Sequence, residues 1–186
     1  MITPESVLAD LDAIDASTYS PWVALVEDRD FQSGASFIMA GNDLERGDDI
    51  YVSKDGIGAD ADLLDLIAEM RTLLPVLLAA VRQLRENSSS PSQSDVERFE
   101  KLFELSHSCE APPWRVELSD GDSGGRDRIS AGGDNFVRAH IEVITDSGPA
   151  DASLLTAITV LRNEIDSLLM EVLPVQGERR AEISIG

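Results

Sequence analysis

Residues Ser20–Asp30 read SPWVALVEDRD, and a similar stretch returns as PPWRVELSDGD over Pro112–Asp122. In both stretches a proline and a tryptophan precede a run in which apolar and polar residues alternate, which is typical of a strand with one buried and one exposed side. A single tryptophan of this kind would suit ligand stacking or partner binding. Because Trp22 and Trp114 occupy the same place in two matching stretches, we expect both to anchor the hydrophobic core.

The similarity between the two stretches extends through most of the chain. At a constant offset of 91 residues, many apolar, glycine and aspartate positions of residues 38–81 recur in residues 129–172. Before the second copy lies NSSSPSQS, Asn87–Ser94, a polar segment without an apolar residue. We therefore predict an internal duplication, with repeat 1 over residues 1–90 and repeat 2 over residues 91–186, which ends in a short C-terminal tail.

Each copy is predicted to form a helix, three strands and a second, longer helix. Short connections rich in glycine and aspartate favour antiparallel hairpins. The predicted fold class is therefore α+β, with two tandem helix-strand-strand-strand-helix repeats that have antiparallel sheets and are related by a pseudo-twofold axis. The predicted elements are Pro4–Ala16, Trp22–Val26, Ser36–Ala40, Ile50–Ser53 and Asp60–Arg85 in repeat 1, and Asp95–Ser106, Trp114–Leu118, Arg128–Ala131, His140–Thr145 and Asp151–Leu173 in repeat 2.

The long helix that closes repeat 1 has a wide apolar stripe, so we expect it to pack against its own sheet and against the equivalent helix. Pro75 is expected to kink or restart this helix, since an interior proline removes a hydrogen bond and clashes with the preceding turn. Asp60 and Asp151 are predicted to cap the two closing helices. For the first helices the predicted N-caps are Thr3 and Ser94, the latter with a glutamate at capping-box spacing.

The chain is strongly acidic. Its 186 residues include 35 acidic and 15 basic residues, which gives a net charge of −20, and both halves are acidic. Nucleic-acid binders present Lys and Arg to the phosphate backbone, so no direct nucleic-acid binding is expected. A basic protein is the natural complement, and DNA mimicry is one form of such binding. The acidity is also compatible with a salt-loving or GC-rich organism, because the only lysines are Lys54 and Lys101, and with a contribution to solubility alone.

No segment is predicted to enter a membrane. The densest apolar run, Leu63–Leu84, contains charged residues, and the N-terminal MITPESVLADLDAIDAS has neither a basic region nor an unbroken hydrophobic core. We therefore expect no membrane partner and a cytoplasmic location. With Cys109 as the only cysteine, neither an intrachain disulfide nor a Cys-based zinc site can be completed.

The acidic residues offer one candidate divalent-cation site. Asp55, Asp60 and Asp62 could supply oxygen ligands, but repeat 2 has Ser153 in place of Asp62, which favours the capping role of Asp60. The segment DGDSGGRD, Asp120–Asp127, begins like a calcium loop but lacks the bidentate glutamate that such a loop needs. The SAGGDN segment lacks the glycine spacing of a phosphate loop. Both segments are predicted to be turns.

Nucleophilic catalysis has few candidate residues. His107, His140 and Cys109 all fall in repeat 2, and no pattern brings a histidine and the thiol together as base and nucleophile. The carboxylates are numerous, but no spacing singles out an acid/base pair. We therefore assign no catalytic, cofactor-binding or metal-ligating residue, and no cofactor.

Three motifs carry a resemblance to a known group of proteins: Ser20–Trp22, Ala59–Leu64 (ADADLL) and Leu73–Val81 (LLPVLLAAV). They resemble small proteins of actinobacterial phages and prophages, in which a Pro-Trp strand, an Ala-Asp-Ala helix start and a Leu-Pro-x-Leu-Leu helix occur in one unit. The resemblance covers residues 4–86 and, less well, residues 95–173, where the helix proline is missing. It implies an accessory protein of phage or mobile-element origin and carries no activity with it.

These observations favour a non-enzymatic, acidic protein-binding module that acts as an inhibitor, antitoxin or immunity-type accessory protein. It would act as a monomer with pseudo-dimeric repeats or as a homodimer. The alternative is a metal-dependent enzyme or small-ligand binder whose Asp and Glu side chains form a site between the repeats.

Overall fold

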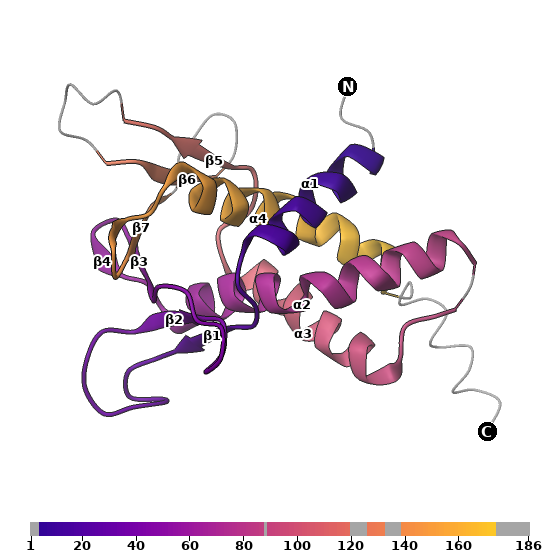
Figure 1. Ribbon diagram of the computed structural model, residues 1–186, viewed down its shortest axis with the longest axis horizontal. Coiled ribbons are helices and arrows are strands. Elements are labelled where there is room, and N and C mark those ends of the chain that lie inside the picture. Colours follow the sequence, from indigo (N-terminus) through magenta and orange to yellow (C-terminus); the bar gives the residue numbers. More distant parts are fainter. Residues whose placement is uncertain (1–3, 88, 120–125, 133–138, 174–186) are drawn as a thin grey trace.

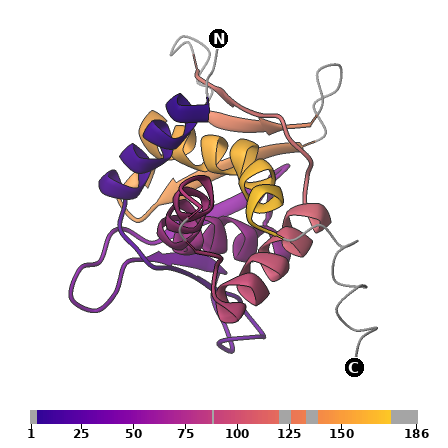
Figure 2. The same cartoon turned by 90° about the vertical axis from the view of Figure 1, so that its right-hand side faces the viewer.

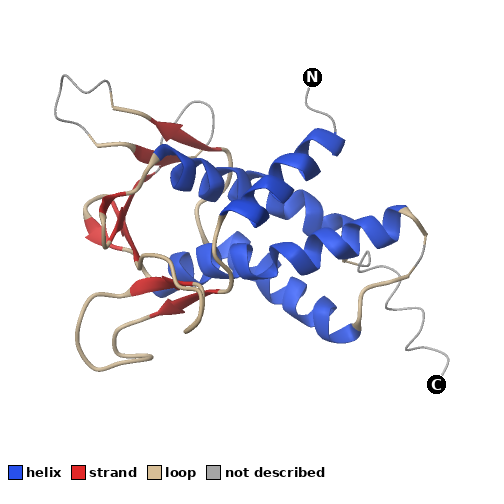
Figure 3. Cartoon of the chain, in the orientation of Figure 1, coloured by secondary structure: helices blue, strands red, loops and turns tan. Residues whose placement is uncertain are grey.

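The computed structural model describes residues 4–87, 89–119, 126–132 and 139–173. In this part of the chain, four helices lie on one side of an antiparallel sheet, and the other side of the sheet carries no helix (Figure 1 and Figure 3). The predicted α+β class is thereby confirmed. Within the same described ranges, no helix is both long enough and apolar enough to cross a bilayer.

The sheet runs through both halves of the chain. Its strands are β1 (Trp22–Leu25), β2 (Phe37–Ala40), β3 (Ile50–Lys54), β4 (Ile57–Gly58), β5 (Trp114–Glu117), β6 (Arg128–Ala131), β7 (Ala139–Thr145) and β8 (Gly148–Pro149). The order is β1-β2-β3-β7-β6-β5, with β4 paired to β3 and β8 paired to β7. The halves meet where β3 pairs antiparallel with β7, and Val52 lies opposite Val143 in that ladder. The two predicted sets of strands therefore join into one sheet.

The helices are α1 (Pro4–Ser17), α2 (Ala61–Arg85), α3 (Gln93–Ser108) and α4 (Ala152–Val172). Helix α2 lies at the centre of the helical layer and contacts the other three helices as well as β1 and β2 (Figure 2). This confirms the prediction that its wide apolar stripe serves several neighbours. The helix continues through Pro75, so the predicted restart is wrong. Pro75 is exposed, while Leu74 and Leu77 beside it are fully buried and hold the two flanking turns in the core.

Alternation along the strands places one set of side chains under the helices. Both tryptophans belong to this set, with 4% of Trp22 and 1% of Trp114 exposed, so their predicted role as core anchors is confirmed. Around them the buried strand residues are Ile38, Ala40, Ile50, Val52, Ile129, Ala131, Ala139, Ile141 and Val143. A cis peptide bond precedes the proline before each tryptophan.

The aspartate caps of the closing helices are confirmed. Asp60 accepts a hydrogen bond from the Leu63 N–H at 2.9 Å, and Asp151 accepts one from the Leu154 N–H at 2.8 Å. Each bond satisfies one of the free N–H groups of a first helical turn.

The predicted cap of the first helix in the second half is wrong. Helix α3 is capped by Ser92, whose hydroxyl oxygen accepts from the Asp95 N–H at 3.2 Å, and Ser94 lies inside the first turn. The Ser92 hydroxyl also donates to the Asp95 carboxylate at 2.6 Å, a contact between the two side chains. Thr3, the other predicted cap, lies outside the described residues.

The short strands β4 and β8 were not predicted. Asp55 and Gly56 connect β3 to β4 with positive φ values of 52° and 78°, as a two-residue type I′ hairpin requires. The Asp-Gly pair in the sequence was therefore a usable signal for β4.

The outer edge of β1 is covered by side chains of neighbouring elements. The Thr72 hydroxyl accepts from the Trp22 N–H at 2.8 Å and donates to the Trp22 carbonyl at 2.7 Å. Further along, Arg29 donates to the Ala24 carbonyl at 3.3 Å. On β5, at the other end of the sheet, the Asn163 side chain bonds the N–H and carbonyl of Trp114 at 2.7 and 2.9 Å.

Candidate functional site

The three aspartates considered for a cation site have separate structural roles. The Asp55 carboxylate accepts from the His140 N–H at 2.9 Å, Asp60 caps α2, and Asp62 is exposed in the first turn of that helix. Among the described residues, no three His, Cys, Asp or Glu side chains converge closely enough to hold a metal ion. Residues 120–125 and 133–135, which include most of the two predicted turns, lie outside the described residues.

The histidines and the cysteine are not arranged as a catalytic pair. The Nδ1 atom of His107 lies 2.8 Å from the Phe103 carbonyl oxygen, and its ring packs against the Phe103 ring. Burial raises the pKa of the Cys109 thiol to about 11. The thiol is therefore protonated at neutral pH and is not activated as a nucleophile.

The uncovered side of the sheet is apolar in the first half of the chain. Phe31 in the β1–β2 loop packs against Phe37 with ring centroids 6.1 Å apart, and Phe37 packs against Tyr51 with centroids 5.8 Å apart. Val23, directly across from Met39, has 38% of its surface exposed. We call this surface the aromatic face; it comprises Val23, Leu25, Phe31, Phe37, Met39, Tyr51 and Ile144.

The aromatic face contains a hollow of about 490 Å³. Tyr51, Ser53 and Ile144 line it from β3 and β7, and Ile57 of β4, which is 74% exposed, lines it from the side. Glu27 brings a carboxylate to the same hollow. A protruding apolar side chain with a nearby positive charge would fit such a surface.

Carboxylates also lie beside the aromatic rings. The Tyr51 hydroxyl donates to Asp146 at 3.3 Å, and the same carboxylate accepts from the Asp49 N–H at 3.2 Å. Desolvation, together with the charge of Asp146, raises the pKa of Tyr51. The apolar surface is thus bordered by negative charge.

The uncovered side of the second half is ionic. Arg128 and Glu117 form an ion pair of 2.8 Å across β6 and β5. The hydrogen bond from Arg128 lowers the pKa of Glu117. Arg115, His140 and Glu142 occupy other positions of this surface. The two halves of the sheet therefore present different chemistry to solvent.

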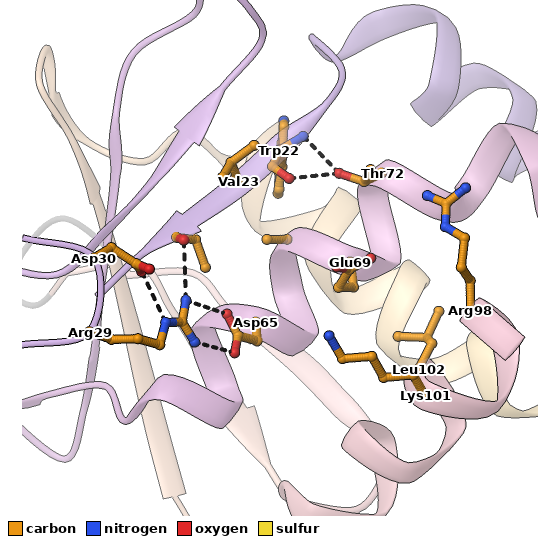
Figure 4. A pocket seen from close by; sticks show the side chains of 12 residues that line it. Trp22, Val23, Arg29, Asp30, Asp65, Glu69, Thr72, Arg98, Lys101 and Leu102 are labelled. Carbon is orange, nitrogen blue, oxygen red and sulfur yellow. Dashed lines mark hydrogen bonds and ion pairs between the residues drawn. The ribbon is translucent and has the colours of Figure 1, made fainter. Parts of the chain in front are cut away.

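A separate cavity of about 550 Å³ lies between β1, α2 and α3, and we call it the β1–α3 cavity (Figure 4). At its β1 end, Arg29 forms ion pairs with Asp65 at 2.6 Å and with Asp30 at 3.0 Å. The hydrogen bond to Asp65 is the main reason that the pKa of Arg29 lies above its usual value. These three residues come from the β1–β2 loop and from α2, so the sequence alone gave no sign that they meet.

Comparison with protein-family models, with characterised proteins and with solved structures finds no match for this chain. The aromatic face could have been predicted from the sequence, because Phe37, Met39 and Tyr51 alternate with core residues. Their counterparts at an offset of 91 are polar: Arg128, Ser130 and Glu142. The β1–α3 cavity could not have been predicted, because its walls come from three segments that are far apart in the sequence.

Proposed function

We propose that this chain is a non-enzymatic module that binds a basic protein through the aromatic face. The observation that carries the proposal is a row of half-buried aromatic and aliphatic side chains, with the exposed Val23 and Ile57 beside them, on a sheet surface that no helix covers. Contiguous exposed apolar surface with a polar border is characteristic of protein-binding sites, and aromatic residues are enriched there. An inhibitor, antitoxin or immunity-type role would use such a surface, as would other forms of protein binding.

We also propose that the chain consists of two fused repeats related by a pseudo-twofold axis, as its sequence suggests. In support, Trp22 pairs with Ala40 in the same way as Trp114 pairs with Ala131. Thr72 binds the backbone of the first tryptophan as Asn163, its counterpart at an offset of 91, binds that of the second. The antiparallel β3–β7 pair would then lie on the axis.

The repeats agree in the core and differ on the uncovered face, which supports a binding role for one of them. Ile38 and Val52 have identical counterparts under the helices. Phe37 and Tyr51, on the uncovered side, correspond to Arg128 and Glu142. The apolar surface of the uncovered side is therefore a property of one copy and not of the repeat itself.

Charge indicates the kind of partner. A second copy of this chain would also carry −20, so the association of two aromatic faces would have to overcome repulsion between like charges. A partner with an apolar anchor and basic flanks is instead attracted to the carboxylates of Glu27 and Asp146 beside the apolar surface.

The test is capture from a lysate of the cells that produce the protein, with the full chain immobilised at near-physiological salt. Phe37→Ser is compared with Arg128→Ser, which introduces the same residue at the corresponding position of the other half. We expect the wild type and Arg128→Ser to retain the same basic protein and Phe37→Ser to lose it. Ile57→Ser, at a position that is 74% exposed and lines the hollow, gives a second variant if Phe37→Ser lowers the melting temperature.

Three outcomes would contradict the proposal. If no basic protein is retained, or if both variants retain it equally, the aromatic face is not the binding site. If Phe37→Ser converts a homodimer to a monomer in sedimentation analysis, the face pairs with a second copy instead.

A further inference from the structure

The β1–α3 cavity contains three charged groups that have no oppositely charged partner in the described part of the chain. Glu69 on α2 and Arg98 and Lys101 on α3 line it, and none of the three forms an ion pair or a hydrogen bond with the described residues. Arg98 and Lys101 are exposed to solvent and Glu69 is half-buried, whereas Arg29, Arg82 and Arg85 are ion-paired. In Figure 4 the Lys101 side chain extends from α3 into the cavity, toward the α2 carboxylates.

The uncompensated charges have opposite signs on different walls. The α2 wall carries the free carboxylate of Glu69, while Asp65 beside it is already bound by both terminal nitrogens of Arg29. The α3 wall carries the two free cations, Arg98 and Lys101. A ligand that satisfies both walls must itself carry an anionic and a cationic group.

Ligands with a single charge fit this cavity less well. A simple anion would face Glu69 and would be repelled by the net charge of −20. A simple cation would face Arg98 and Lys101. A zwitterion has no net charge, so the long-range field does not oppose its entry, and each of its charged ends finds an unpaired partner.

The remaining lining is apolar and supplies a surface for a small hydrocarbon group. Val23 and Ala24 of β1 lie on one side, Ala68 and Leu102 come from the two helices, and the Trp22 side chain forms part of the wall. A volume of about 550 Å³ lies within the range of roughly 300–1,000 Å³ that is usual for small-molecule sites.

We infer that the β1–α3 cavity binds a small zwitterion of the amino-acid type. Its carboxylate lies against the Lys101 ammonium group of α3, its ammonium group lies beside Glu69, and its apolar side chain lies against Leu102 and the Trp22 wall. This site borders the aromatic face only at Val23 on the edge strand β1, because its charged walls are on α2 and α3, on the helical side of the sheet. It stands whether or not that face binds a protein.

The charged lining of the cavity is not repeated in the other half of the chain. At an offset of 91, Arg98 and Lys101 correspond to Val7 and Asp10, and Glu69 corresponds to Val160. No equivalent set of opposed charges is therefore built at the β5 end of the sheet by the same positions.

The experiment is titration of the 15N-labelled full chain, followed through the indole N–H signals of its two tryptophans. The probes are each standard amino acid and, for leucine, two singly charged analogues: 4-methylpentanoate and isoamylamine. We expect one or more amino acids with apolar side chains to shift the Trp22 signal in a saturable way, while Trp114 serves as an internal control. The singly charged analogues should bind at least about tenfold more weakly than their zwitterion, because each loses one charge-assisted contact.

Variants test the assigned walls. Glu69→Gln and Lys101→Gln should each weaken binding about tenfold or more, whereas Glu104→Gln, an exposed substitution on α3 outside the cavity, should leave it unchanged. The inference is overturned if no amino acid shifts the Trp22 signal. It is equally overturned if 4-methylpentanoate or isoamylamine binds as well as leucine, since the cavity would then select a single charge.

Discussion

Arg71 and Arg162 are charged residues that are almost completely buried, each with 1% of its surface exposed. Arg71 forms an ion pair with Asp15 at 2.8 Å and donates to the Thr18 carbonyl at 2.8 Å. Arg162 donates to the carbonyls of Ser106 and Glu110 at 2.8 and 3.1 Å. In each half, the guanidinium thus ties the end of the first helix to the segment that leads into the tryptophan strand.

Replacing Arg71 should therefore destabilise the protein far more than replacing an exposed arginine on the same helix. Arg71→Met removes a buried guanidinium, leaves the partly buried Asp15 and Thr18 carbonyls without this donor, and is expected to lower the free energy of unfolding by about 3–5 kcal/mol. Arg82→Met removes an ion pair with Asp12 in which both side chains are 44–50% exposed, and it should cost no more than about 1 kcal/mol. Urea denaturation measures both values, and equal losses would show that the buried network contributes nothing special.

Cys109 gives a prediction about pH. Burial raises the pKa of its thiol to about 11 from an ordinary value of 9.0. The thiol form is therefore favoured by folding, and the resulting stabilisation is present below pH 9 and is lost as the pH rises toward 11. We expect the alkylation rate of the native protein to follow a titration with its midpoint near pH 11, with about a hundredfold less thiolate at pH 8 than in the urea-unfolded chain. A native midpoint at or below 9 would contradict the burial of this side chain.

At the scale of the elements, the N-cap of α2 can be tested by replacing each of two nearby aspartates with alanine. Asp60 accepts the Leu63 N–H, whereas Asp62 is exposed inside the first turn. Asp60→Ala should lower the free energy of unfolding by about 1 kcal/mol. Asp62→Ala removes only a favourable interaction with the helix dipole and should cost about 0.5 kcal/mol or less. Thermal denaturation measures both losses, and Asp151→Ala is the matching change in α4. A larger loss of stability in Asp62→Ala than in Asp60→Ala would contradict the capping role of Asp60.

Most element positions could be predicted because the signals are local. The apolar periodicity of α2 and the alternation around Trp22 and Trp114 lie within single segments, and the structure places a helix or strand at each. The predictions were wrong where the local structure depends on contacts with other residues. Pro75 continues a helix because the core holds the turns on both sides of it, and Ser92 replaces Ser94 as a cap because Asp95 pairs with it.

The pairing of β3 with β7 and the β1–α3 cavity could not be predicted in the same way. Each joins segments that are far apart in the chain, and the hydrophobic pattern of one strand does not determine which other strand it pairs with. The asymmetric uncovered face is an intermediate case. Its alternating residues are visible in the sequence, but only the sheet shows that Phe31, Phe37 and Tyr51 pack into one surface.

For the whole molecule, the central β3–β7 pair predicts cooperative unfolding. The strands of both halves form one sheet, and α2 packs against both α3 and α4 of the second half. Neither half would keep a complete core if the other unfolded, so we expect a single transition. In urea, the indole N–H signals of Trp22 and Trp114 and the far-ultraviolet circular dichroism should change with the same midpoint. Two separate midpoints would show that the halves are independent domains.

The covered edge of β1 has a consequence for behaviour at high concentration. A strand edge with free N–H and carbonyl groups is a template on which another chain can add a strand and begin a fibril. On β1, Thr72 binds the outward-facing N–H and carbonyl of Trp22 and Arg29 binds the carbonyl of Ala24, and on β5 Asn163 binds the N–H and carbonyl of Trp114. Two helical side chains and one loop arginine thus occupy backbone groups that another strand would need for pairing. The molecule can therefore carry apolar side chains on its sheet surface without its edge strands starting aggregation.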